Sequence, residues 1–274
     1  AGDVFADAAW AGDINGDGRN DVLVGAQGND DAGADAGAAY VFFGGSLSGS
    51  VDAGTSADVT LTGEDADDAA GSAVWGAGDF DGDGNDDLLI GALRDDDGGT
   101  DAGAAYIVLG PVTSDFSLAL ADIKYTGVAD SSGVGQFASL VGVDDTNNDG
   151  LDDVLIGANT ESAAAFNSGA AYLVQGSTTP GSGTFSLSTA DAKFEGYAAR
   201  DRAGDSVGRA GDVDGDGNAD IIVGAGYSSY DSDQGGGVYV LTGPFSGTSS
   251  VQDAYFHTWV SEDGARAAGR GVCD

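Results

Sequence analysis

Three reactive residue types are nearly missing from this chain of 274 residues, which has one histidine, one cysteine and lysine at two positions only. The single cysteine, Cys273, excludes an intrachain disulfide and gives no information on the redox compartment. The single histidine, His257, falls in a segment with strand character, so we expect a strand residue rather than a general base. Carboxylates are so numerous that no catalytic pair stands out. The sequence therefore favours a protein that is not an enzyme.

Basic residues are also scarce, with 9 Lys and Arg against 46 Asp and Glu, for a net charge of −37. This charge argues against nucleic acid and anionic membrane surfaces as partners. Two explanations of the acidity stay open. One is a high-salt habitat, where charge repulsion is screened within roughly 3 Å at 1 M salt. The other is an extracellular, calcium-rich protein.

Long apolar runs and helical periodicity are absent as well. No run is long enough to cross a bilayer, and the N-terminus lacks the regions of a signal peptide, so we expect no membrane insertion. If the protein is secreted, this would be the mature chain or an excised piece. No segment of twelve or more residues is free of glycine or keeps a 3.6-residue period, which excludes a helical protein.

What is present is one motif in four copies, starting at Asp13, Asp79, Asp145 and Asp212, with spacings of 66, 66 and 67 residues. In the second copy, Asp79-Phe80-Asp81-Gly82-Asp83-Gly84-Asn85-Asp86-Asp87, oxygen-bearing side chains occupy positions one, three, five and nine. Glycine is at position six, and an aliphatic run follows. Such a fixed period predicts an array of similar units.

Each unit contains four short segments with strand character. They are 5–12, 21–26, 38–44 and 57–63; 72–78, 87–92, 104–110 and 122–128; 137–143, 153–158, 170–176 and 191–197; and 206–211, 220–225, 237–243 and 253–260. Four strands form one antiparallel blade, so we predict an all-β fold, most simply a β-propeller. The second segments are continuously aliphatic, whereas the fourth alternate, as in Asp122-Ile123-Lys124-Tyr125-Thr126. We therefore expect the second strand to be deep and the fourth at the rim. Gly-Ala-Ala-Tyr at 37–40, 103–106 and 169–172 suits the close approach of neighbouring blades.

The predicted array is a single unit spanning 1–274, with repeats at 1–66, 67–132, 133–199 and 200–262. Residues 262–272 align without a gap on 64–74, so 263–274 would be the first strand of a fifth repeat. That strand would compete with the N-terminal one in a closed ring of four blades. We therefore expect an open part of a larger propeller, or chains that complete each other.

The four loops predict cation binding, and calcium fits best because it accepts several oxygen ligands with irregular geometry. Glycine at position six permits a left-handed turn, and position seven would offer its carbonyl. An EF-hand is excluded because position twelve is Val24, Ile90, Ile156 or Val223 rather than glutamate. About four calcium ions per chain are expected, the loop with Asn147 in place of Asp81 being weakest or second weakest. The predicted ligands are Asp13, Asn15, Asp17, Arg19, Asp21, Asp79, Asp81, Asp83, Asn85, Asp87, Asp145, Asn147, Asp149, Leu151, Asp153, Asp212, Asp214, Asp216, Asn218 and Asp220.

The pattern from Ala77 through Gly91-Ala92 to Gly103-Ala104-Ala105-Tyr106 resembles the FG-GAP repeat of integrin α-subunit propellers and their bacterial and archaeal relatives. This resemblance covers essentially the whole chain. It implies a propeller with calcium in the loop between the first two strands of each blade, and it supports Asp79, Asp81, Asp83 and Asp87 as ligands. The Phe-Gly pair of the family survives here only as Phe5-Ala6 and Phe137-Ala138, and integrin rings have seven blades where this chain supplies four.

Three functions remain open at this stage. The first is a calcium-binding, extracellular or cell-surface module for adhesion and protein interaction. The second is a carbohydrate-binding or polysaccharide-active propeller, including a lyase, and the third is a structural piece of a larger surface protein. Trp10, Trp75 and Trp259 could stack on sugar, but Trp10 and Trp75 precede metal loops in first strands, so we expect them to pack.

In an up-and-down blade, the loops between second and third strands share a face with the connections between blades, opposite the calcium loops. Because these segments vary most among repeats, we expect a protein or glycan ligand there. They are 27–36, 93–102, 159–168 and 226–235, with the connections 64–70, 129–135 and 198–205. Their aromatic and basic residues are Phe166, Tyr227, Tyr230, Arg94, Arg200 and Arg202.

Overall fold

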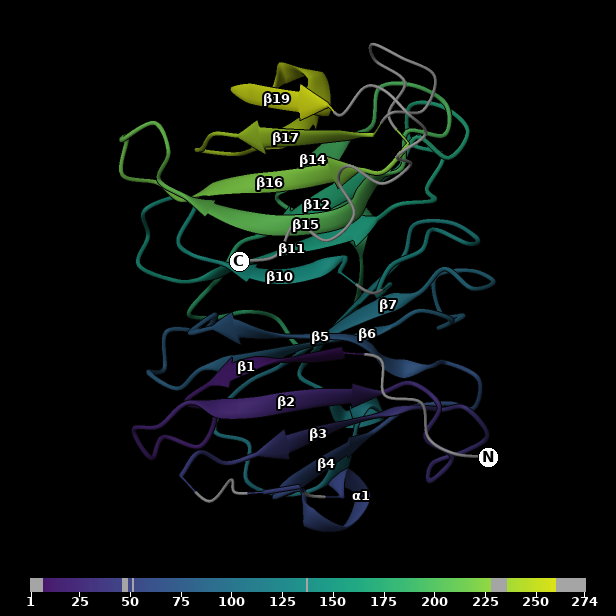
Figure 1. Cartoon of the computed structure of the whole chain (residues 1–274), viewed down its shortest axis with the longest axis vertical. Coiled ribbons are helices and arrows are strands. Elements are labelled where there is room, and N and C mark those ends of the chain that lie inside the picture. The colour runs from purple at the N-terminus through teal and green to yellow at the C-terminus, as the bar shows by residue number, and fades with distance from the viewer. Residues whose placement is uncertain (1–6, 46–48, 51, 137, 228–235, 260–274) are drawn as a thin grey trace.

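The computed structural model describes residues 7–45, 49–50, 52–136, 138–227 and 236–259. Its strands form four separate sheets, and in Figure 1 the N-terminal sheet lies in the lower half of the molecule and the C-terminal sheet in the upper half. Among these residues, α-helix is limited to α1 (Ala53–Ser56). The all-β prediction is confirmed, and the four sheets are consistent with a β-propeller, although the described strands form no closed sheet.

Each sheet contains four antiparallel strands from one repeat. Sheet 1 has β1 (Asp7–Gly12), β2 (Asp21–Ala26), β3 (Ala38–Phe42) and β4 (Val59–Thr62); sheet 2 has β5 (Ala70–Gly78), β6 (Asp87–Ala92), β7 (Ala104–Val108) and β9 (Ile123–Thr126). Sheet 3 has β10 (Leu140–Val143), β11 (Asp153–Ala158), β12 (Ala170–Val174) and β14 (Ala192–Glu195); sheet 4 has β15 (Ala203–Gly211), β16 (Asp220–Ala225), β17 (Gly237–Leu241) and β19 (Phe256–Trp259). The predicted bounds of all four second strands are confirmed.

A fifth strand completes each of the first three sheets, and it comes from the next repeat. These strands are β8 (Phe116–Ser117), β13 (Gly183–Ser186) and β18 (Gly247–Ser250), which pair in parallel with β4, β9 and β14. A 3₁₀ turn follows each of them, at Leu118–Leu120, Leu187–Thr189 and Val251–Asp253. The expectation that the fourth strand forms the rim is therefore wrong for sheets 1 to 3, because the borrowed strand lies outside it.

The core lies between successive sheets. The inner strands pack in order, β1 against β5, β5 against β10 and β10 against β15. The second strands β6 and β11 are buried at every position, as their aliphatic sequence predicts. Glycine allows the close approach expected of the Gly-Ala-Ala-Tyr segments, since a Cβ on Gly37 would lie 2.1 Å from the carbonyl oxygen of Ala70.

Two residues contradict their predicted environment. Trp10 is 72% exposed instead of packed. At the same register position, Gly76 and Gly142 face the backbone of the preceding sheet, and the described chain has no sheet before sheet 1. Lys124 is only 5% exposed, although its strand was expected to alternate between core and solvent. Trp75 is half-buried and packs against two apolar clusters of the core, as expected.

Loops gather on two opposite sides of the molecule, as the sequence predicts. In Figure 1 the loops between first and second strands emerge at the left, and those between second and third strands at the right. Backbone hydrogen bonds tie the right-hand loops to the connections between sheets, as from Arg94 N to Asp68 O at 3.1 Å and from Arg200 N to Phe166 O at 2.8 Å. After the predictions made for them, we call the left side the metal-loop face and the right side the ligand face.

Several predicted features lie outside the described residues. They are the fifth repeat at 263–274, Cys273, Tyr230, and the Phe5-Ala6 pair and Phe137. His257 is a residue of β19, as expected. No helix among the described residues has the length and apolar character needed to span a bilayer.

Candidate functional site

The four predicted cation loops share one backbone conformation. Glycine at position six has φ of +85°, +92°, +89° and +95° in the four loops, which confirms the left-handed turn. The carboxylate at position one accepts a hydrogen bond from the N–H of this glycine, at 2.8 Å for Gly18 and 3.2 Å for Gly84. The oxygen at position three accepts the N–H of position five, as from Asp83 N to Asp81 Oδ1 at 3.0 Å. The loops thus turn their carboxylates inward.

Position nine is the buried end of each loop. Asp21, Asp87, Asp153 and Asp220 are all fully buried. In the second loop, Asp87 accepts hydrogen bonds from Phe80 N at 2.8 Å and from Gly110 N at 2.7 Å, and the other three make the same pair of contacts. Burial raises the pKa of Asp87 to about 7 and that of Asp153 to about 6. This residue therefore fastens the loop to the turn after the third strand and adds a carboxyl group to the site.

Loops 2 and 4 each bring three carboxylates together. Oxygens of Asp79, Asp81 and Asp87 lie within 4.8 Å of one another, as do those of Asp212, Asp214 and Asp220. Asp79 Oδ1 is buried and has no hydrogen-bond partner among the described residues. An orphaned carboxylate oxygen beside two further carboxylates fits a divalent cation, and an all-oxygen donor set suits calcium. Asp83 and Asp216 at position five are exposed and lie outside these clusters.

Loops 1 and 3 bring no such set of three carboxylates together, because Asn15 and Asn147 stand at position three. Asn147 donates its amide N–H to Asp149 Oδ2 at 3.0 Å, so one carboxylate there is already engaged. Their calcium sites remain predictions. The carbonyl role of position seven, at Arg19, Asn85, Leu151 and Asn218, also stays a prediction.

Neighbouring loops are joined by a residue that the sequence pattern did not single out. At position eight, Asp86 accepts the N–H of Asp13 at 2.6 Å, and Asp152 accepts that of Asp79 at 2.9 Å. Each bond runs from one repeat to the next. In repeat 4 the position is Ala219, whose backbone N–H donates to Asp145 O at 2.9 Å but which has no carboxylate to offer. Asp86 and Asp152 stand at the same position of their repeats, and this recurrence was the sequence signal that could have predicted the contact.

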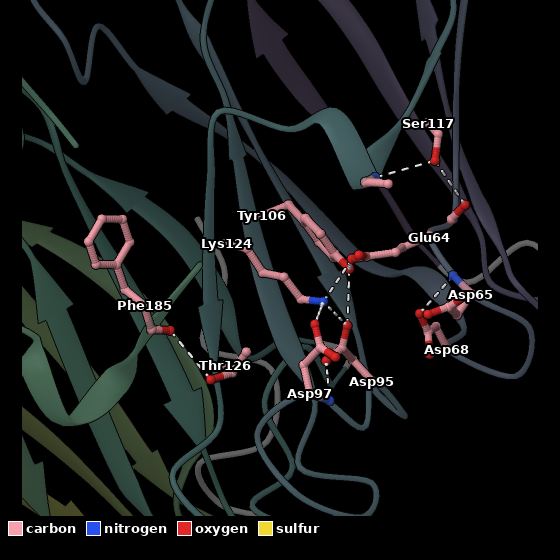
Figure 2. Close-up of polar contacts among 12 residues, drawn as sticks. Glu64, Asp65, Asp68, Asp95, Asp97, Tyr106, Ser117, Lys124, Thr126 and Phe185 are labelled. Carbon is pink, nitrogen blue, oxygen red and sulfur yellow. Dashed lines mark hydrogen bonds and ion pairs between the residues drawn. The ribbon is translucent and has the colours of Figure 1, made fainter. Parts of the chain in front are cut away.

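A second carboxylate cluster lies on the ligand face and already contains a cation. Figure 2 shows the ammonium of Lys124 among Glu64, Asp95 and Asp97, at 2.8, 2.6 and 2.6 Å. The Tyr106 hydroxyl lies 2.9 Å from Glu64 Oε2. Burial alone would lower the pKa of Lys124, but these hydrogen bonds raise it above its usual value. Because the lysine ammonium already pairs with all three carboxylates, we interpret this cluster as a structural element rather than a metal site.

The other lysine of the chain has the same place in sheet 3. Lys193 faces Tyr172 across the strands as Lys124 faces Tyr106, and it pairs with Glu161 at 2.9 Å. Sequence reasoning missed both clusters. The signal was that both lysines of this acidic chain fall at one position of the repeat.

Cavities open on both faces of the described part of the chain. One of about 490 Å³ lies on the metal-loop face between the inner strands, lined by Trp10, Trp75, Asp86, Asp152 and Arg209 among others. The other, of about 270 Å³, lies on the ligand face between sheets 2 and 3.

Comparison with known proteins gives one family. A family model described as FG-GAP repeat matches residues 5–42, 70–108 and 203–241, which begin repeats 1, 2 and 4. Each match covers the first three strands of a sheet together with its predicted cation loop. A search of curated proteins with the whole sequence gave no match.

Proposed function

Because the chain carries three FG-GAP repeats, which are characteristic of integrin α-like β-propeller proteins, we propose that it is a calcium-binding propeller that acts outside the cell as an adhesion and protein-interaction module. FG-GAP proteins are typically interaction modules without enzymatic activity. The observation that carries the calcium part is the orphaned Asp79 Oδ1 within the cluster of three carboxylates. In this proposal calcium fixes the metal-loop face, and recognition takes place on the ligand face.

Calcium content is the first test. We expect four ions per chain by elemental analysis after dialysis against trace calcium, and fewer than three would contradict the motif interpretation. Asp79→Ala and Asp212→Ala should each remove one ion, because each deletes a member of a three-carboxylate cluster. Asp83→Ala should also remove one ion and lower the melting temperature if position five is a ligand. Asp65→Ala is the matched control, since Asp65 is an exposed carboxylate on the ligand face.

Binding is coupled to folding in this proposal, since an empty cluster of carboxylates repels itself. Chelation should therefore lower the melting temperature of the wild-type chain by more than that of Asp79→Ala. Equal shifts in the two proteins would show that loop 2 binds no stabilising ion.

The ligand face is tested by substitutions that leave the metal loops intact. Tyr227 is half-buried beneath Arg202, whose guanidinium carbon lies 4.8 Å from the ring centroid, and Arg200 is exposed next to it. We expect Tyr227→Ala, Tyr230→Ala or Arg200→Ala to weaken partner binding without changing calcium content. A partner whose footprint maps onto the metal loops or the larger cavity would refute this assignment of faces. Self-association, or pairing with remaining blades of a larger chain, would be seen as a mass above that of one chain by light scattering.

Carbohydrate binding is the second candidate function. The observation in its favour is the cavity on the ligand face, which is lined mainly by polar side chains. A glycan array separates this function from protein adhesion.

A further inference from the structure

The cavity between sheets 2 and 3 is built from three segments that hydrogen bonds hold in place. Its walls are the loop after β6, the connection between the two sheets, and the end of β11. Ser131 N donates to Thr100 O at 2.8 Å, and Thr160 Oγ1 donates to Ser131 O at 2.7 Å. The lining residues are Leu93, Arg94, Asp101, Ser131, Gly133, Gln136, Asn159 and Thr160. The cavity is therefore a fixed feature of the fold and not a gap between loose loops.

Asn159 supplies the unsatisfied group of this cavity. Its side chain is 1% exposed, and its Oδ1 has no hydrogen-bond partner among the described residues. Its Nδ2 donates to Asp205 Oδ1 at 2.7 Å and to Gln136 Oε1. Since a carboxylate can only accept, the amide orientation is determined, and the carbonyl oxygen is the free end. A buried acceptor without a donor costs about 1–3 kcal/mol, so the site favours a ligand that donates.

Gly133 keeps the cavity open because it has no side chain. A Cβ on Gly133 would lie 2.4 Å from Asn159 Oδ1 and 2.6 Å from Thr160 Oγ1. At the other two junctions the equivalent residues are Ala69 and Arg202, and both have positive φ. Like Gly133, each comes one position before a residue whose backbone N–H donates to the end of a loop in the preceding sheet. At the junction of sheets 3 and 4, Arg202 lies over the ring of Tyr227, which stands where sheet 3 has Thr160. Arg202 and Tyr227 therefore occupy this space at the junction of sheets 3 and 4, whereas the smaller Gly133 and Thr160 stand there at the junction of sheets 2 and 3.

We propose that this cavity binds a neutral saccharide unit, whose hydroxyl group donates to Asn159 Oδ1. Arg94 and Asp101 give the rim one charge of each sign, so neither an anion nor a cation is favoured by the pair. The net charge of −37 further disfavours acidic sugars. Hydroxyl groups both donate and accept, which matches the mixed amide, hydroxyl and charged lining. The volume of about 270 Å³ suits one sugar ring, since pockets for drug-sized ligands run from roughly 300 Å³ upward.

The inference rests on the ligand face proposed above and names one class of ligand for it. The test is a glycan array of neutral and acidic oligosaccharides probed with the full chain in calcium. Isothermal titration calorimetry then follows with the best neutral glycan. We expect neutral glycans to bind, and Asn159→Leu to weaken binding at least tenfold, because leucine is what sheet 2 places at this position as Leu93.

A second variant and a control keep the test sharp. Thr160→Tyr copies the equivalent Tyr227 and should block the cavity without removing the buried amide, again with at least a tenfold loss. Gln27→Leu removes the amide at the same position of sheet 1 and should bind like wild type. Binding only to acidic glycans, binding unchanged in both variants, or an array without any signal would overturn the inference. If a protein partner still depends on Tyr227 and Arg200 while the array is empty, only the saccharide is wrong, and the proposed function stands.

Discussion

At the scale of single residues, buried carboxylates in this chain rely on the backbone more than on basic side chains. The four aspartates at position nine are fully buried and are each held by two backbone N–H groups. Asp86 and Asp152 likewise accept a backbone N–H of the preceding repeat. With only 9 basic residues for 46 acidic ones, ion pairs cannot fulfil this task. Each of the two lysines, Lys124 and Lys193, lies in a cluster where several carboxylates meet.

Asp68 gives a prediction for pH dependence. Burial raises its pKa from 3.8 to about 6, and the nearby Asp95 charge adds to this rise. A raised carboxyl pKa means that Asp68 stabilises the fold below pH 4 and that this contribution is lost as the pH rises through 6. Asp68→Asn keeps an acceptor for Asp65 N, so at pH 7.5 its free energy of unfolding should exceed that of wild type by about 3 kcal/mol, the equivalent of a pKa raised from 3.8 to about 6. Thermal melts in calcium at pH 4 and 7.5 measure this.

The exposed neighbour provides the control for that experiment. Asp67 also has positive φ, which asparagine tolerates, so Asp67→Asn should leave the melting temperature unchanged at both pH values. An Asp68→Asn chain less stable than wild type at pH 7.5 would show that the ionised carboxylate is needed.

Residues with a fixed motif spacing could be predicted, whereas residues that meet only through pairing of strands could not. Asp79, Asp81 and Asp87 come together as the motif requires. Lys124 reaches Glu64 across 60 residues of sequence, and no local pattern marks such a contact. Asn159 was missed for the same reason, because its partner Asp205 belongs to the next repeat.

At the scale of elements, the contacts between repeats are of two kinds. On the metal-loop face, position eight of one loop holds the first residue of the loop before it. At the rim, strands β8, β13 and β18 extend the sheet of the preceding repeat. Both contacts point from a repeat to its predecessor, so each sheet depends on the one that follows.

Asp86→Ala should affect the loop of its neighbour. The substitution removes the acceptor of Asp13 N, a bond of 2.6 Å, and so loosens the first ligand position of loop 1. We expect a loss of about 1–3 kcal/mol in stability and weaker calcium binding at loop 1, seen as one low-affinity site in calorimetric titration. Asn20→Ala, at the same position of repeat 1, should change neither quantity.

Phe185→Ala tests the borrowed strand β13. The Phe185 ring lies 5.7 Å from that of Tyr125 in β9 and packs into the core between sheets 2 and 3. Its loss should cost about 2 kcal/mol, less than for a fully buried phenylalanine, and should expose residues 177–186 to limited proteolysis. Phe166→Ala is the control, because this ring is 64% exposed. Unchanged proteolysis would show that the side chain does not hold β13.

The main strands were predictable because aliphatic runs and glycine punctuation mark them, but the borrowed strands were not. β8 has two residues, and β13 and β18 have four each that are largely polar. Such segments carry no period-two signal. Their pairing is decided by the sheet that they meet and not by their own sequence.

At the scale of the whole molecule, the excess of negative charge is the dominant electrostatic feature. It surrounds an apolar core that joins each sheet to the next. The 66-residue period of the sequence predicts this serial arrangement. The number of blades in a complete ring, by contrast, depends on contacts beyond the described strands.

Salt should therefore stabilise the calcium-free chain. Raising sodium chloride from about 0.1 to 1 M shortens the screening length from roughly 10 to 3 Å and weakens the repulsion among 46 acidic groups. We expect the melting temperature, followed by circular dichroism in chelator, to rise with salt, and to rise less when calcium is present. Potassium chloride should act alike. A flat or falling curve would show that repulsion among the acidic groups does not limit the stability of the calcium-free chain.

The borrowed strands also impose an order on the making of the molecule. Leu61 of β4 pairs with Phe116 of β8, 55 residues later in the chain. At a synthesis rate of roughly 5–20 residues per second, the ribosome needs about 3–11 s between these two residues. During that interval the edge of the nascent first sheet is uncovered, and the same wait recurs for the second and third sheets. Each sheet edge is thus covered only after most of the next repeat has been synthesised. The growing chain is therefore more exposed to edge-to-edge aggregation than the finished protein.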